Sequence, residues 1–419
     1  MMNSYSNVKK KYSGTASAVK LFNIILYVLI YAGYIKLLFP QVGTVLTVLQ
    51  YLGMVLGLVF ILISTDKRIL INTKPFSTLG WIFLCFIILS LEYYRTYNST
   101  FARSKISAFL ITAIYSIFIY IYSRNLSDDE ALQSFISTIV NVNTLVVLLY
   151  IAIHITSILS LIRQGLRGGD VYSNPIWIAR LCSDTVILIF CGSKSKFTPI
   201  QIFRIVMLFG IAILMGSKGP IIATGIVLLI YYQSRGNLNY KLLATIAAII
   251  IIGIIAFFIA RTNSSFIRSR FSLSSILVSS PGYRISRYEY TLKKIPKNFW
   301  IGYGLGNWPI DYWRSVSFTP AWVTNEMKLI DYPHNMVLEI MYDGGLVSLI
   351  PFIASLFSIR KHSRYYGELQ NTRPLFLLII ANFIYAMFSG GITIGNTGFY
   401  YFIALYCGIQ NARAVANIQ

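Results

Sequence analysis

Charge is scarce in this sequence, and its scarcity sets the class of the protein. Only 12% of the residues are Asp, Glu, Lys or Arg, about half the share found in soluble domains. Hydrophobic residues make up 56% of the chain, and apolar runs of about 20 residues recur from end to end, each sufficient to cross a hydrocarbon core of ~30 Å as a helix. The composition therefore excludes a soluble globular protein. It predicts an all-α, polytopic integral membrane protein.

Cysteine and histidine are also rare, with four and three residues. The cysteines lie in or beside apolar runs, without CxxC spacing and without a nearby histidine: Cys85, Cys182, Cys191 and Cys407. We therefore expect neither disulfides nor a metal site, but four small buried side chains. We also expect no cofactor and no nucleic-acid partner.

The hydrophobic pattern predicts about twelve membrane-spanning helices, at residues 20–39, 42–64, 79–95, 106–123, 134–160, 176–192, 199–215, 220–233, 242–260, 335–357, 374–390 and 394–411. Lys and Arg concentrate in the N-terminal segment and in every second long loop, which predicts that both termini are cytoplasmic. The chain then divides into about nine helices within 1–260, an external loop at 261–333, and about three helices within 334–419.

The loop 261–333 departs from the rule that external loops carry few cations. It holds ten Lys and Arg residues but only four acids. Its length explains how the charge is tolerated during insertion, but not why the charge is present. A basic surface beside a membrane suits an anionic partner such as a phosphate. Anionic lipid headgroups are the alternative.

Two parts of this loop have recognisable local structure. Pro281-Gly282 predicts a turn, and the apolar spacing after it predicts a helix over 284–295. Arg284 and Arg287 fall in the first turn of that helix, where cations oppose the helix dipole, so a functional role is favoured. Alternating glycines at 302, 304 and 306 would let the backbone approach a ligand or another segment closely. The GxGxG spacing, without a preceding strand, excludes a dinucleotide fingerprint.

The segment that follows the loop, PHNMVLEIMYDGGLVSLI (333–350), places His334 and Asn335 where a polar loop enters an apolar run. Lys218, in the turn between two predicted spans, lies on the same side of the membrane in this topology. Alone it would be read as an anchoring lysine. Arg180 and Asp184 lie four residues apart within a predicted span, a spacing that favours a salt bridge over a proton relay.

Over residues 215–350, the chain resembles the O-antigen ligase and O-antigen polymerase superfamily. The resemblance lies in the order of four motifs: SKG, R-x3-Y-x3-L-x2-I, GYGLGN and PHNMVLEIMYDGG. The resemblance implies a multi-pass glycosyltransferase of the bacterial inner membrane with a periplasmic active site and no metal. Its donor would be a glycan on undecaprenyl diphosphate. His334 takes the histidine position and Arg284 the arginine of the loop helix. Lys218 stands where the family usually has arginine, which keeps the charge but loses the bidentate fork. Arg287 could substitute for it.

The residue types suit this chemistry independently. Fixed cations can stabilise charge on a departing diphosphate, and a neutral imidazole can take the proton of an acceptor hydroxyl. Asn335, Gly304 and Gly306 are expected near the substrate, and Glu339 either orients a neighbour or binds a sugar hydroxyl.

Three functions remain open: a polymerase of lipid-linked repeat units, a ligase that moves the glycan to lipid A core, and a flippase or other transporter of lipid-linked sugars. A transporter would show internal repeats, and none is visible. We favour a polymerase because the N-terminal half lacks a family signature, which suits a divergent enzyme adapted to one glycan. Expected partners are the lipid-linked glycan, membrane lipids and a chain-length regulator protein.

Overall fold

The computed structural model describes residues 16–63, 73–163, 176–192, 197–215, 217–233, 280–316, 323–365, 372–393 and 397–416. Within these ranges the secondary structure is helical, without strands. The helices occupy every predicted span except 242–260, which lies outside the described residues, as does 261–279. The longer helices are α2 (Ala16–Leu38), α3 (Gly43–Ile63), α4 (Thr73–Leu91), α5 (Ser99–Ser123), α6 (Asp129–Arg163), α7 (Ile176–Gly192), α8 (Pro199–Leu214), α9 (Lys218–Gln233), α16 (Met336–Tyr365), α17 (Arg373–Ser389) and α18 (Thr397–Ala416).

Five helical stretches among the described residues are long and apolar enough to cross a membrane: Lys20–Leu38, Ser77–Arg95, Ser99–Leu126, Asp129–Ser160 and Met336–Ile359. The all-helical, membrane-type fold is therefore confirmed. The count of about twelve spans and the three-part division of the chain stay predictions.

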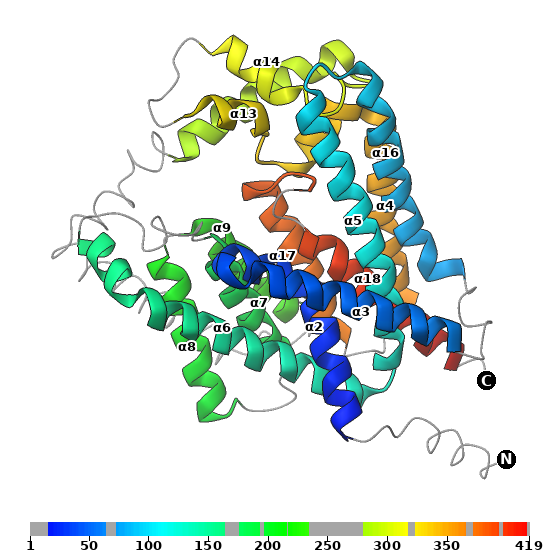
Figure 1. The fold of residues 1–419 in the computed structure, drawn as a ribbon, viewed down its shortest axis with the longest axis vertical. Helices are drawn as coiled ribbons and strands as arrows, with labels where there is room; N and C mark the ends of the chain where they lie inside the picture. Colours follow the sequence, from blue (N-terminus) through cyan, green and yellow to red (C-terminus); the bar gives the residue numbers. More distant parts are fainter. Residues whose placement is uncertain are drawn as a thin grey trace.

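The helices pack in two neighbouring groups. In the first, α4 lies along α16 and α5 along α18 (Figure 1). In the second, α7 contacts α6, α8, α9 and α17. The four cysteines are free and buried, as expected from their apolar surroundings.

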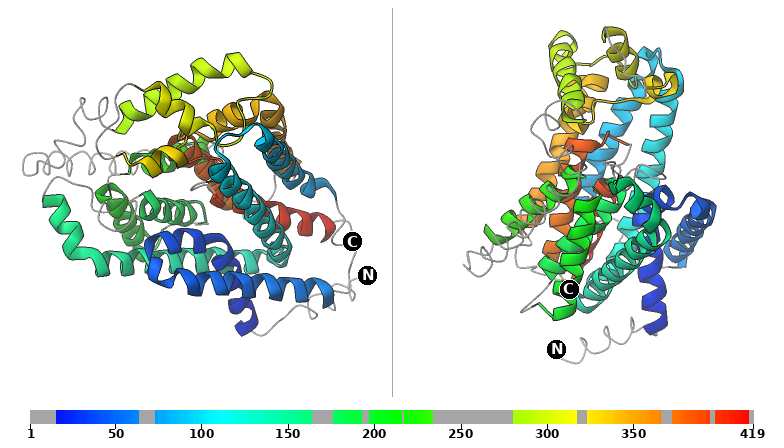
Figure 2. Two further views of the ribbon diagram at one scale, coloured as in Figure 1. Left: turned by 45° about the horizontal axis from the view of Figure 1, so that its top comes forward. Right: turned by 90° about the vertical axis from the view of Figure 1, so that its left-hand side faces the viewer.

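The described part of the loop forms short helices at one end of the molecule: α13 (Ser280–Lys294), α14 (Trp308–Ser315) and α15 (Asn325–Ile330). Figure 1 shows α13 and α14 at the top of the molecule, beside the upper ends of α5 and α16, and both contact α16. In both views of Figure 2 the yellow-green loop helices again lie at the top. Trp308, Tyr312, Trp313, Val323 and Tyr342 form a small core that joins this end to α16. The predicted turn at Pro281-Gly282 is instead the first turn of α13, because proline is tolerated at the start of a helix, where its missing N–H has no partner to lose. Arg284 and Arg287 therefore lie beyond the first turn, and the prediction that they oppose the helix dipole there is wrong.

Candidate active site

His334, α13 and the C-terminal end of α17 meet at one point. The Tyr288 hydroxyl, on α13, donates to the carbonyl oxygens of His334 at 3.2 Å and of Met387 at 3.1 Å. The Asn335 side-chain amide also donates to the Met387 carbonyl, at 3.3 Å. The carbonyl at the end of α17 therefore fixes the loop helix and the histidine segment against the membrane helices.

His334 has an unusual backbone. Its φ is 60°, in the left-handed region. Among the described residues, His334 alone has a positive φ without being a glycine. Such positions cluster at functional sites, although His tolerates them better than most residues. Asn335 follows this left-handed residue and caps the start of α16. Its side-chain oxygen accepts a hydrogen bond from the Leu338 N–H at 3.0 Å. The sequence predicted Asn335 near the substrate, and the structure gives it this capping contact.

The imidazole of His334 is poised as a neutral base. Its side chain is 23% exposed, and Nε2 lies 3.9 Å from Oδ1 of Asp331. Nδ1 is buried and has no hydrogen-bond partner among the described residues, and the ring centroid lies 4.4 Å from that of Tyr332. Burial, followed by the charges of Arg287 and Arg284, holds the pKa of His334 well below its usual range. The ring is therefore uncharged at neutral pH and can accept a proton.

The two arginines of α13 differ in their partners. Arg287 is buried and forms an ion pair with Asp331, whose carboxylate also accepts from Nε1 of Trp313 at 3.1 Å. Arg284 is half-buried, and within the described part of the chain it forms no ion pair with a carboxylate. Burial lowers its pKa. The charge of Arg284 is thus available to an anion, whereas that of Arg287 is compensated.

Lys218 and Arg180 approach this region from the other group of helices. Lys218 begins α9, and its neighbour Gly219 packs against Phe388 and Ser389 of α17. Arg180, on α7, donates to Oγ of Ser389 at 3.2 Å. The structure thus brings Lys218 to the end of α17 that holds the histidine segment.

Arg180 and Asp184, four residues apart on α7, both have partners on α17. Asp184 accepts from the Tyr385 hydroxyl at 3.2 Å and from the Asn382 amide at 3.5 Å, whereas Arg180 reaches Ser389. These contacts connect α7 to α17, and the salt bridge between Arg180 and Asp184 stays a prediction. Arg180 was not predicted near the site. The sequence feature that could have indicated Arg180 is its place as an ionisable side chain at the outer end of a predicted span.

The alternating glycines pack against other segments. An added Cβ at Gly302 would lie 2.5 Å from the Tyr342 carbonyl oxygen, and one at Gly304 would lie 2.9 Å from that of Arg95. The N–H of Gly304 also donates to the Asp343 carbonyl at 3.0 Å. Of the two alternatives, the structure favours close approach to another segment, and the same holds for Gly306, which adjoins Ala102.

Glu339 lies within α16 rather than on an open surface. Its side chain is 1% exposed, and Oε1 lies 2.5 Å from Nζ of Lys105 on α5. Oε2 accepts from the Ile392 N–H at 2.7 Å. These contacts favour the orienting role over direct binding of a sugar hydroxyl.

A family model described as O-antigen ligase matches residues 203–353. This part of the chain is therefore similar to the O-antigen ligase family. The matched region contains Lys218, Arg284, Arg287 and His334, and it supports the O-antigen ligase and polymerase superfamily inferred from the motifs. A search of curated proteins returned no match. Across the described ranges, no three His, Cys, Asp or Glu side chains gather as a metal site would require, and metal independence stays a prediction.

Proposed function

We propose that this protein polymerises lipid-linked oligosaccharide repeat units of a surface polysaccharide. The observation that carries the proposal is that a partly exposed, neutral His334, just before α16, lies within the electrostatic influence of Arg284 on α13, and that Arg284 forms no ion pair with a carboxylate of the described residues. One residue can accept a proton and the other can hold an anion, as transfer from a lipid diphosphate requires.

In the proposed reaction, the glycan on undecaprenyl diphosphate is the donor. The bond between its anomeric carbon and the diphosphate oxygen breaks, and a bond to the acceptor hydroxyl oxygen forms. His334 takes the proton from that hydroxyl, and undecaprenyl diphosphate leaves with the bonding electrons. Arg284 stabilises the charge that develops on the leaving oxygen.

Lys218 is the better candidate for the second diphosphate contact. It approaches the end of α17 from α9, whereas the charge of Arg287 is engaged by Asp331. Arg287 would then act on the reaction mainly through His334, whose pKa it lowers.

A ligase is the second candidate, and the description of the family model favours it. Donor chemistry is the same in both cases, and only the acceptor differs. Purified protein should be supplied with a defined lipid-linked repeat unit, with and without lipid A core. A ladder of lengthening lipid-linked products without the core supports the polymerase. A single transfer that requires the core supports the ligase, and no transfer in either reaction would contradict both.

The proposal places the described loop helices in the periplasm and both termini in the cytoplasm of the inner membrane. A cysteine at exposed Glu326, on α15, should therefore react with an impermeant thiol reagent in cells with a permeabilised outer membrane. A cysteine at exposed Asp128, before α6, should react only after lysis. The native cysteines are buried and give a low background. The reverse labelling pattern would overturn the orientation.

The environment of His334 predicts where activity should fall on the acidic side of the pH–activity profile. The base works when neutral, so activity falls as pH drops through its pKa. Because burial and two arginines lower this pKa, the limb in kcat/KM for the free enzyme should lie below pH ~6.5. Arg284→Gln removes one cation and should shift the limb to higher pH, whatever the residual rate. A wild-type limb above pH ~6.5, or a limb unmoved by Arg284→Gln, would contradict the assignment.

A further inference from the structure

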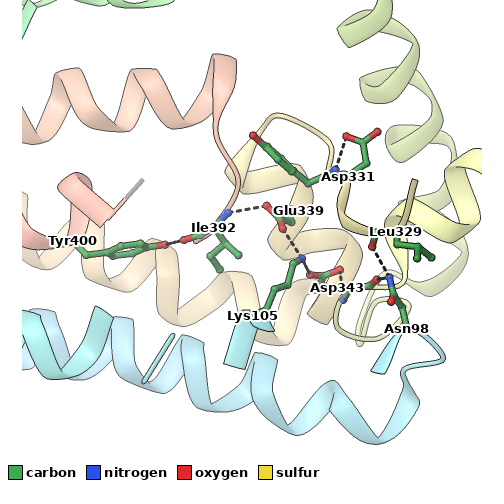
Figure 3. Close-up of polar contacts among 10 residues, drawn as sticks. Asn98, Lys105, Leu329, Asp331, Glu339, Asp343, Ile392 and Tyr400 are labelled. Atoms are coloured by element: carbon green, nitrogen blue, oxygen red, sulfur yellow. Dashed lines mark hydrogen bonds and ion pairs between the residues drawn. The ribbon is translucent and has the colours of Figure 1, made fainter. Parts of the chain in front are cut away.

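A buried charge cluster lies beside the histidine segment, between α5 and α16. Lys105 is 2% exposed, and its Nζ lies 2.5 Å from Oε1 of Glu339 and 2.6 Å from Oδ2 of Asp343, each 1% exposed (Figure 3). Glu339 and Asp343 are four residues apart, so both carboxylates lie on one face of the helix. A single lysine thus holds two carboxylates in the first turns of α16.

The cluster connects α16 to two further segments of the site. Oε2 of Glu339 accepts from the Ile392 N–H at 2.7 Å, in the connection between α17 and α18. Oδ1 of Asp343 accepts from the Gly306 N–H at 3.3 Å, in the glycine segment. Figure 3 shows the contacts from Lys105 to Glu339 and on to Ile392 on one side, and from Lys105 to Asp343 on the other.

These contacts extend to the surroundings of His334. An added Cβ at Gly391 would lie 2.5 Å from Oε2 of Glu339 and 3.2 Å from Cδ2 of Tyr332, and the Tyr332 ring contacts His334. A path of direct neighbours therefore runs from the lysine to the imidazole. The position of His334 depends on where these segments meet.

A buried ion cluster is a weak source of stability, because desolvation of the charges offsets their attraction. Its distinctive property is that it requires one geometry. Lys105 reaches both carboxylates only when α5 and α16 keep one relative arrangement, and Glu339 in that position also accepts from the Ile392 N–H. Apolar side chains of similar volume would fill the space without that requirement.

We propose that Lys105 is a positioning residue for glycan transfer, acting through Glu339 and Asp343 on the segment that carries His334. The inference rests on the proposed function. A displacement of reacting groups by about 1 Å can cost ~10²-fold in rate. Loss of Lys105 should therefore lower kcat strongly, while KM for the lipid-linked donor changes little because Arg284 and Lys218 remain.

Lys105→Met alone leaves two buried carboxylates without a cation, which is destabilising. The informative variant is therefore the neutral triple change Lys105→Met, Glu339→Gln and Asp343→Asn. Lys105→Arg is a second variant that keeps the charge and alters the geometry. Lys36→Met is the matched control, since Lys36 lies in α2 with its Nζ 2.5 Å from Gln50 on α3.

Thermal stability, kcat and KM are measured for all variants, with wild type and His334→Ala in the same assay. We expect the triple variant to regain wild-type stability with kcat at least ~10-fold reduced and KM nearly unchanged, and Lys36→Met to match wild type. Normal kcat in any stable Lys105 variant, or an effect confined to KM, would overturn the positioning role. If Lys105→Arg is the only stable Lys105 variant, its kcat alone tests the positioning role. Failure of the wild-type protein to transfer glycan would instead reject the proposed function.

Discussion

Replacing His334 by alanine is expected to lower kcat by ~10²–10⁴, the usual contribution of a positioned base, while the protein stays folded and inserted. The side chain is partly exposed, and the contact from Tyr288 is made to its backbone carbonyl, so truncation leaves the surrounding packing in place. Product lengths on a gel, with a defined lipid-linked repeat unit and purified enzyme, measure the loss.

Two further substitutions separate chemistry from structure. His334→Gln keeps hydrogen bonding without basicity, and His334→Asn also suits the left-handed backbone, which asparagine adopts readily. Both should be as inactive as alanine. His154→Ala, on α6, is the matched control and should retain activity. Near-normal chain growth by His334→Gln would reject the general base and leave only a hydrogen-bonding role.

Replacing Arg284 by alanine should cost about 10²–10³-fold in kcat, as removal of one donor to a developing oxyanion does elsewhere. Arg284→Lys should retain more activity, because charge survives although the bidentate geometry is lost. Lys218→Arg should be tolerated, since arginine restores the residue usual in the family.

Lys293→Ala provides the control for Arg284. Lys293 is an exposed cation of the same helix, with its Nζ 2.5 Å from Oε1 of Glu289, and its loss should change kcat little. Normal glycan length and yield from Arg284→Ala, at normal expression, would show that the diphosphate role is wrong.

Hydrophobic periodicity located the helices well because burial in lipid or in neighbouring helices demands long apolar stretches. Hydrophobic periodicity did not predict the polar ends of these helices. The span predicted at 106–123 begins at Ser99 in α5, so Lys105 appeared to lie in a loop. It is instead buried in the helix by carboxylates more than 200 residues away in sequence.

The sequence motifs predicted some residues of the candidate site. They could not predict the contacts between residues that are far apart in the sequence. His334 and Arg284 stood out by position and charge, and the structure brings both beside Tyr288 and Tyr332. The pairing of Arg287 with Asp331 joins residues 44 apart, and no local pattern indicates which of two neighbouring arginines will be neutralised. The break in α16 at Gly345, with φ of 62°, was likewise absent from the predicted continuous span.

The break at Gly345 determines how α16 could sit in a membrane. The apolar stretch Met336–Ile359 has 24 residues, and the backbone at Gly345 divides it. The part after the break, residues 346–359, measures about 21 Å at 1.5 Å per residue, less than the ~30 Å of hydrocarbon. If α16 crosses the membrane, the part before the break must therefore lie at least partly within the bilayer. Under the proposed orientation, His334 would then lie close to the outer lipid headgroups, where a lipid-linked carrier could reach it by diffusing sideways in the membrane.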